Sequence, residues 1–286
     1  MIYVIIGPTA SGKTTAANKL AEFLDCPIIN GDAFQIYKDM NIGTNKIQSD
    51  DPNYKRYLLL DIVEPNIQFS VKEYQERFRA LDIKQYKDVV ICGGTGLYIR
   101  AALYDYDFPI SEEKDEEYLD KTNEELYEML VSLDKEASEK IHPNNRKRVI
   151  RAINLINHSG KLKSEIINSQ EHKLIYDNVC FMFINPNREE LYENINSRVD
   201  EMFDKGLINE VESLLSKYEL SLTATQGIGY KEVISYLKGE CSLLACKEMI
   251  KQRTRNYAKR QVTFFKHQFD CKEYRSYKEL IKEFVK

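Results

Sequence analysis

The chain has 286 residues and a formal net charge of −4 at pH 7. This length is enough for one large α/β domain or for a core domain that carries an insertion. The acidic balance excludes a surface coated in basic residues, so a nucleic-acid partner would have to bind a local basic patch.

The chain opens directly on the apolar run MIYVII, with no targeting segment before it. No apolar stretch reaches the roughly 18 residues that a membrane-spanning helix needs. The six cysteines lack the C-x-x-C pairs of a zinc ribbon. We therefore expect a cytoplasmic protein with reduced cysteines and no membrane partner.

Short apolar runs at 2–6, 27–30 and 88–94 are each followed by turn residues and then by helix-like sequence. This alternation is typical of a parallel sheet flanked by helices. The run VCFMFIN at 179–185 is apolar throughout, which predicts another buried strand of the same sheet. After Asn185 the sequence predicts helices to the end of the chain.

Residues 111–175 are more charged than the rest and have helical patterns. The segment HPNNRKRVIR concentrates cations at the start of an apolar helix. A charge run of this kind is by default a solvated helix face, but a basic turn before an apolar helix can also form a binding edge. We interpret 111–175 as a helical insertion domain between two parts of an α/β core, 1–110 and 176–286.

The stretch GPTASGKT at 7–14 matches the pattern G-x-x-x-x-G-K-[ST] between a predicted strand and a predicted helix. Its backbone N–H groups and the positive end of the helix would surround a phosphate chain. Lys13 would add a mobile charge, and the Thr14 hydroxyl would hold Mg²⁺. The pattern predicts a P-loop NTPase-like fold with phosphates bound by Gly7, Pro8, Thr9, Ala10, Ser11, Gly12, Lys13 and Thr14.

A phosphate-binding loop does not define a reaction. Kinases and nucleotide hydrolases usually add a second carboxylate at the end of a later strand, but the third run ends VVICGGTG. The base-recognition pattern N-K-x-D of GTPases is also missing. The remaining acid is Asp32 in GDAFQIY, and the residues alone leave open whether it caps a turn or acts as a base.

A series of blocks along nearly the whole chain resembles the tRNA dimethylallyltransferase family. They are GPTASGKT, GDAFQIYKDMNIGT, DIVEP, FSVKEY, GGTGLY, IHPNNRKRVIRAI, NREELYENINSRVDEMFDKGLINEV, GIGYKE and TRNYAKRQVTFF. The resemblance implies transfer of a dimethylallyl group from its pyrophosphate to the N6 amine of the adenine 3′-adjacent to the tRNA anticodon. It also implies that the loop at 7–14 holds a pyrophosphate leaving group.

By the same resemblance, Asp32 is the general base and acts beside Thr14. An aromatic amine is a weak nucleophile, so a carboxylate that accepts its proton lowers the barrier. Lys13, Mg²⁺ and loop amides would stabilise the departing charge. The residues implied in tRNA binding are Asp32, Ala33, Phe34, Gln35 and Thr95 near the target base, and Lys147, Arg148 and Arg151 of the insertion at the anticodon stem.

The chain departs from the family pattern at a few positions. Tyr57 and Leu58 stand where many members have His-His or His-Arg, so the resemblance gives that pair no polar role. Phe264 replaces the usual tryptophan. Gln226 stands where some relatives carry an arginine near the pyrophosphate, and its role stays open.

The segment 247–260 carries two neighbouring cationic stripes of a predicted helix, interrupted only by Glu248. The stripes consist of Lys251, Arg255 and Lys259, and of Arg253 and Arg260. A solvated helix is the alternative, but the density of charge favours RNA phosphates. We predict that Arg255 and Lys259 contact tRNA.

Three other functions remain open from the sequence. A P-loop small-molecule kinase would transfer the γ-phosphate of Mg·ATP, and an adenylate isopentenyltransferase would modify a free nucleotide. A non-catalytic RNA-binding module would need no base. The basic segments favour tRNA, with an anticodon stem-loop and dimethylallyl pyrophosphate as partners of a monomer.

Overall fold

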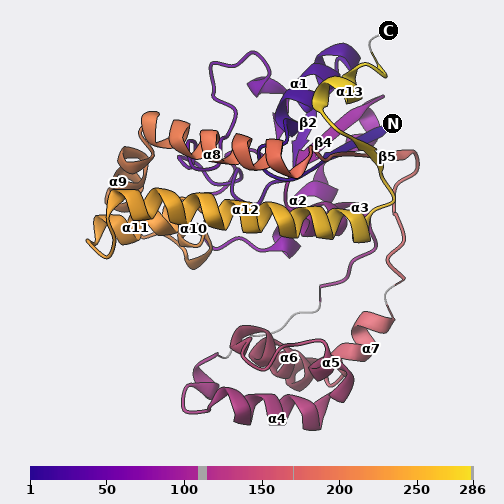
Figure 1. The fold of residues 1–286 in the computed structure, drawn as a ribbon. Helices are drawn as coiled ribbons and strands as arrows, with labels where there is room; N and C mark the ends of the chain where they lie inside the picture. Colours follow the sequence, from indigo (N-terminus) through magenta and orange to yellow (C-terminus); the bar gives the residue numbers. More distant parts are fainter. Residues whose placement is uncertain (109–114, 170, 285–286) are drawn as a thin grey trace. The chain divides into compact units, whose positions relative to one another are not determined.

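A six-stranded parallel sheet forms the centre of one of the two units into which the chain divides (Figure 1). That unit comprises Met1–Leu103 and Tyr176–Lys286, and the other comprises Tyr104–Ile175. The computed structural model describes residues 1–108, 115–169 and 171–284. The domain boundary expected between residues 110 and 111 therefore lies outside the described residues.

The sheet has the spatial order β3-β2-β4-β1-β5-β6. Its strands are β1 (Ile2–Ile6), β2 (Ile28–Asn30), β3 (Tyr57–Leu58), β4 (Val89–Gly93), β5 (Val179–Ile184) and β6 (Lys272–Tyr274). The four predicted strands are confirmed, and their unbroken apolar sequence fits strands with neighbours on both sides. The two edge strands, β3 and β6, were not predicted. Strand β6 also shows that the expectation of helices from Asn185 to the end was wrong.

The register of the sheet brings three loops together at one edge. Ile6 pairs with Gly93, and Asn30 pairs with Cys92, so β1, β2 and β4 end side by side. In open parallel sheets, ligands bind beyond the carboxyl ends of the strands. A Cβ on Gly93 would lie 2.1 Å from the Gly31 carbonyl oxygen, so only glycine allows these loops to approach so closely.

Helices cover both faces of the sheet (Figure 1). Met182 and Ile184 of β5 join a core with α1 and α13, whereas Phe183 contacts Phe265 of α12. This alternation follows the period of two of a strand. The helices of this unit are α1 (Lys13–Leu24), α2 (Val71–Ala80), α3 (Gly96–Leu103), α8 (Arg188–Asp204), α9 (Leu207–Lys217), α10 (Leu222–Thr225), α11 (Tyr230–Leu237), α12 (Leu243–Gln268) and α13 (Tyr277–Ile281), with 3₁₀ turns η1 (Tyr54–Arg56) and η2 (Ile83–Gln85).

The second unit is helical in its described part. It contains η3 (Asp115–Tyr118), α4 (Asn123–Leu133), α5 (Lys135–Glu139), α6 (Arg146–Ser159) and α7 (Lys163–Asn168). Leu126 and Leu130 of α4 pack against Val149 and Ile153 of α6 to form its core. None of the helices in the described parts of either unit has the length and apolarity needed to cross a membrane.

Candidate active site

Residues 7–12 connect the end of β1 to α1 in a tight turn, and Lys13 and Thr14 form the start of α1. Ala10 and Gly12 have φ values of 62° and 87°, in the left-handed region. Gly12 is also the N-cap of α1. The first N–H groups of a helix have no partners within the helix and carry its positive partial charge. The loop therefore presents donors and positive potential to whatever lies above it.

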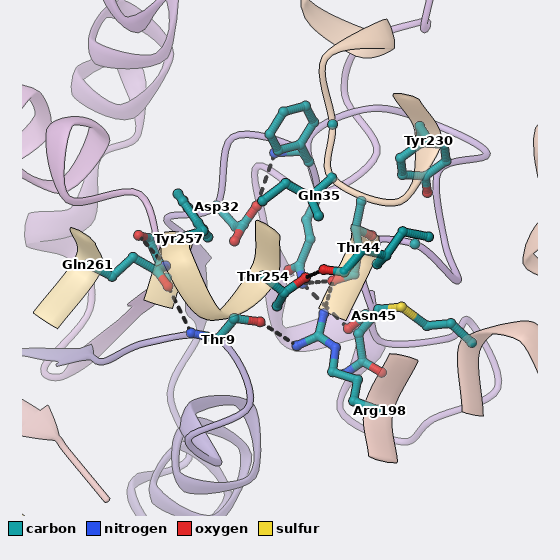
Figure 2. A pocket seen from close by; sticks show the side chains of 18 of the residues that line it. Thr9, Asp32, Gln35, Thr44, Asn45, Arg198, Tyr230, Thr254, Tyr257 and Gln261 are labelled. Atoms are coloured by element: carbon teal, nitrogen blue, oxygen red, sulfur yellow. Dashed lines mark hydrogen bonds between the residues drawn. The ribbon is translucent and has the colours of Figure 1, made fainter. Parts of the chain in front are cut away.

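A cavity of about 290 Å³ opens over this loop, and all of its walls belong to the unit with the sheet (Figure 2). Its polar wall includes Thr9, Lys13, Thr14, Asp32, Gln35, Thr44, Asn45, Arg198, Gln226, Thr254, Tyr257, Arg260 and Gln261. Its apolar wall includes Phe34, Val199, Met202, Ile228 and Ile250. The cavity can therefore hold a ligand that joins a charged part to a small apolar part.

Lys13 lies in the cavity wall with its ammonium group largely removed from water. Its Nζ donates a hydrogen bond of 2.6 Å to the Pro8 carbonyl oxygen of the same loop. Burial lowers the pKa of Lys13 to about 8. The negative charge of Asp32 acts against this shift, and the positive charge of Arg198 adds to it by a smaller amount. A phosphate that enters the cavity would find an ammonium group with few competing partners.

Asp32 uses one of its two carboxylate oxygens in a turn. Its Oδ1 accepts a hydrogen bond of 3.0 Å from the Phe34 N–H, and its own N–H donates to Asn30 Oδ1. Its Oδ2 accepts no hydrogen bond from any residue that the structure describes. The two interpretations left open by the sequence are thus compatible, because the turn leaves Oδ2 free while the residue lines the cavity.

Two residues that the sequence reasoning did not single out hold the site together. Arg198 of α8 donates from Nη1 to Thr9 Oγ1 at 2.7 Å and from Nη2 to the Thr44 carbonyl oxygen at 3.3 Å. Gln261 of α12 donates to the Gly94 carbonyl oxygen at 2.8 Å and accepts from the Thr9 N–H at 2.9 Å. Both lie in the blocks quoted above, but no local pattern marks them as site residues.

Comparison with known proteins shows the family to which the chain belongs. A family model described as IPP transferase matches residues 35–268. The chain belongs to the IPP transferase family. The tRNA dimethylallyltransferases of Anoxybacillus flavithermus and Geobacillus thermodenitrificans are each 44% identical to it, and each match covers 93% of this chain and 88% of the relative. The resemblance inferred from the sequence is confirmed.

Solved structures of the IPP transferase family share the fold. The tRNA delta(2)-isopentenylpyrophosphate transferase of Staphylococcus epidermidis is 39% identical with a TM-score of 0.72, over 99% of this chain and 97% of that one. A eukaryotic dimethylallyltransferase acting on tRNA is 27% identical with a TM-score of 0.79, over 92% of this chain and 69% of that one. The predicted P-loop NTPase-like α/β fold is confirmed.

Not every residue predicted for the site lines the cavity. Thr9, Lys13, Thr14, Asp32, Phe34 and Gln35 line it, whereas Ala33 and Thr95 do not. Thr95 Oγ1 instead accepts a hydrogen bond of 3.0 Å from the Ala33 N–H, which ties the loops after β2 and β4 together. Gly7, Pro8, Ala10, Ser11 and Gly12 form the β1–α1 loop outside the lining. Whether any of these residues binds pyrophosphate or tRNA stays a prediction.

The cations of α12 are less free than their spacing suggested. Lys251 lies 2.9 Å from Asp200 and Arg253 pairs with the buried Glu232, so neither belongs to an open stripe. Arg255 donates to Asn196 Oδ1 at 2.6 Å. Lys259 is exposed and forms no ion pair with a described residue. Pairing of Lys251 and Arg253 reduces the free positive charge of the two stripes, and the tRNA contacts of Arg255 and Lys259 stay predictions.

In the second unit, Lys147, Arg148 and Arg151 of α6 are exposed, as a nucleic-acid contact requires. Lys163 of α7 adds a charge beside them. Burial lowers the pKa of Lys163 most, followed by the charges of Arg148 and Arg151. These cations therefore form a local positive cluster, and their contact with an anticodon stem stays a prediction.

The departures from the family pattern have separate places in the fold. Tyr57 lies on β3, where its hydroxyl donates a hydrogen bond of 2.8 Å to Asn18 Oδ1, so this aromatic residue does make a polar contact. Phe264 packs so closely on Gly96 that a Cβ there would lie 2.3 Å from its ring. Gln226 lines the cavity and accepts a hydrogen bond of 3.2 Å from Lys231.

Proposed function

We propose that the chain transfers a dimethylallyl group from dimethylallyl pyrophosphate to the exocyclic N6 amine of the adenine 3′-adjacent to the tRNA anticodon. The allylic C–O bond breaks and pyrophosphate leaves with the bonding electron pair. The N6 lone pair forms the new C–N bond, and the amine proton passes to Asp32 Oδ2. The products are N6-dimethylallyl adenosine in tRNA and pyrophosphate.

The observation that carries this proposal is that one cavity contains both the β1–α1 loop and the free oxygen of Asp32. A Cβ built on Gly94 would lie 3.5 Å from Asp32 Oδ2 and 2.5 Å from Gln261 Nε2. The base and the amide that holds Thr9 therefore flank the same glycine. Lys13 and Arg198 supply cationic groups for the leaving pyrophosphate, whose charge grows as the C–O bond breaks.

The shape and lining of the cavity also support a small prenyl donor. Its volume of about 290 Å³ lies near the lower end of the roughly 300–1,000 Å³ typical of small-molecule sites. The apolar side chains of Val199, Met202 and Ile250 can accommodate hydrocarbon, which a nucleoside triphosphate does not offer. Tyr257 lies near Asp32 (Figure 2), and the Phe34 N–H donates a hydrogen bond to Asp32. Both rings line the cavity and provide aromatic faces on which an extruded base can stack.

Mg²⁺ is the proposed cofactor, with the Thr14 hydroxyl as its ligand from the loop. Thr14 and Asp32 line the same cavity, and no cluster of three or more His, Cys, Asp or Glu side chains exists among the described residues. This sparse donor set fits a cation that keeps several waters and binds through one or two protein oxygens and the substrate phosphates. When bound, it would neutralise charge on the departing pyrophosphate.

The test is to incubate the protein with dimethylallyl pyrophosphate, Mg²⁺ and unmodified tRNA, digest the tRNA, and analyse its nucleosides by mass. We expect an adenosine that is heavier by one dimethylallyl group in place of a hydrogen, located 3′ to the anticodon. Parallel reactions with free AMP as acceptor, or with ATP as phosphate donor, separate the two rival enzyme activities. Product with AMP but not with tRNA, or transfer of the γ-phosphate, would refute the proposal.

A further inference from the structure

Glu210 of α9 lies outside the cavity, yet its carboxylate organises part of the cavity wall. Its Oε2 accepts hydrogen bonds from the backbone N–H groups of Asn41 and Ile42, at 3.0 and 2.7 Å. Its Oε1 accepts from the Gly43 N–H at 3.2 Å and from the Tyr230 hydroxyl at 2.7 Å. Three successive N–H groups that converge on one anion form a stable nest. Glu210 thus fixes the loop of residues 41–43 to α9 and α11.

The next residue of that loop connects the two ends of the cavity. The Thr44 carbonyl oxygen accepts a hydrogen bond of 3.1 Å from Gln35 Nε2 and one of 3.3 Å from Arg198 Nη2 (Figure 2). Arg198 also donates to Thr9 in the β1–α1 loop. Gln35 follows the Asp32 turn. The Thr44 carbonyl therefore orients two side chains. Gln35 lies at the end of the cavity proposed for the adenine, and Arg198 lies at the end proposed for the pyrophosphate.

The packing around Glu210 leaves this loop little freedom to take another conformation. A Cβ on Gly43 would lie 2.5 Å from the Tyr230 ring, so the ring is seated directly on the backbone that Glu210 holds. On the other side of Thr44, the buried Lys46 pairs with Asp61. The Thr44 carbonyl lies between these two anchors. Glu210 binds the three N–H groups immediately before it, while the carbonyl oxygens of Asn41 and Ile42 accept hydrogen bonds from the N–H groups of Lys46 and Asn45.

We propose that Glu210 is a positioning residue of the transfer reaction. By holding residues 41–43, it places the Thr44 carbonyl where it aligns both Gln35 and Arg198. This inference rests on the proposed function, in which Arg198 faces the pyrophosphate and Gln35, as the family resemblance implies, faces the target adenine. It predicts that one change outside the cavity weakens the binding of both substrates.

The test substitution is Glu210→Gln. The glutamine side chain has one acceptor oxygen and one NH₂ group, so at least one of the three loop N–H groups loses its acceptor. We expect the KM values for dimethylallyl pyrophosphate and for tRNA to rise together, each by roughly tenfold, as for loss of one hydrogen bond to a charged group. The dissociation constant of inorganic pyrophosphate, measured by calorimetry, should rise by a similar factor.

Two variants of the same helix provide controls. Glu212→Gln makes the same chemical change at an exposed position two residues away, and it should leave all constants unchanged. Leu214→Ala removes a buried side chain that is 1% exposed, so it should lower the melting temperature without changing either KM. All assays are run well below the melting temperature of the least stable variant.

The outcomes separate this inference from the proposed function. Unchanged KM values in Glu210→Gln, or an equal rise in Leu214→Ala, would overturn the positioning role. If the parent protein transfers nothing to tRNA, the proposed function fails. The pyrophosphate titration then still decides whether Glu210 orders the phosphate end.

Discussion

Replacement of Asp32 by asparagine separates the turn role of this residue from its proposed role as a base. The Phe34 N–H donates to Oδ1 only, and an asparagine carbonyl oxygen can accept that bond equally well. The change therefore removes the negative charge and the free acceptor at Oδ2 while it keeps the turn. We expect folding and the affinities for tRNA and pyrophosphate to stay close to those of the parent.

The chemical step should slow by about 10²- to 10⁴-fold, the usual contribution of a positioned general base. At 1.36 kcal/mol for each factor of ten, this corresponds to a barrier higher by about 2.7 to 5.4 kcal/mol. An interaction made mainly in the transition state changes turnover and leaves binding unchanged. Loss of a negative charge near the phosphates should also strengthen pyrophosphate binding slightly.

The assay is single-turnover transfer to tRNA, with thermal melting as a measure of folding. Asp51→Asn is a matched control, because Asp51 Oδ1 caps the Asn53 N–H at 2.8 Å in the same type of turn outside this cavity. The control should transfer at the parent rate. A well-folded Asp32→Asn variant that transfers within a few-fold of the parent rate would refute the base role.

Other consequences can be measured separately. Because the pKa of Lys13 is lowered to about 8, its ammonium group loses its charge as the pH rises through about 8, and affinity for dimethylallyl pyrophosphate should decrease by up to tenfold per pH unit. The Lys13→Ala variant should bind dimethylallyl pyrophosphate weakly, and its affinity should not change with pH in this range. Lys259→Ala should weaken tRNA binding and reduce the slope of log affinity against log salt by about one; an unchanged slope would assign Lys259 to a solvated face. Gly93→Ala should lower the free energy of unfolding by about 1 to 3 kcal/mol in urea titrations, because its Cβ would overlap the Gly31 carbonyl; parent-like stability would contradict the close approach.

The sequence by itself determined the central strands, the loop at 7–14 and the family. These features have local causes. A strand buried on both faces needs an unbroken apolar run, and a tight turn before a helix needs glycine at Gly12, where φ is 87°. Both requirements concern residues that follow one another in the chain, so the sequence shows them directly. The edge strands β3 and β6 were not predicted, because strands of two or three residues are too short to show a hydrophobic periodicity.

Only the tertiary structure decided which side chains meet around the cavity. The helices that supply these side chains are far along the chain from the residues they bind. Thr9 is 189 residues from Arg198 and 252 residues from Gln261, and Asn41 is 169 residues from Glu210. The hydrophobic periodicity of a sequence does not predict such contacts, because they depend on how α8, α9 and α12 pack. The same packing paired Lys251 and Arg253 with carboxylates of other helices, which their spacing on α12 could not reveal.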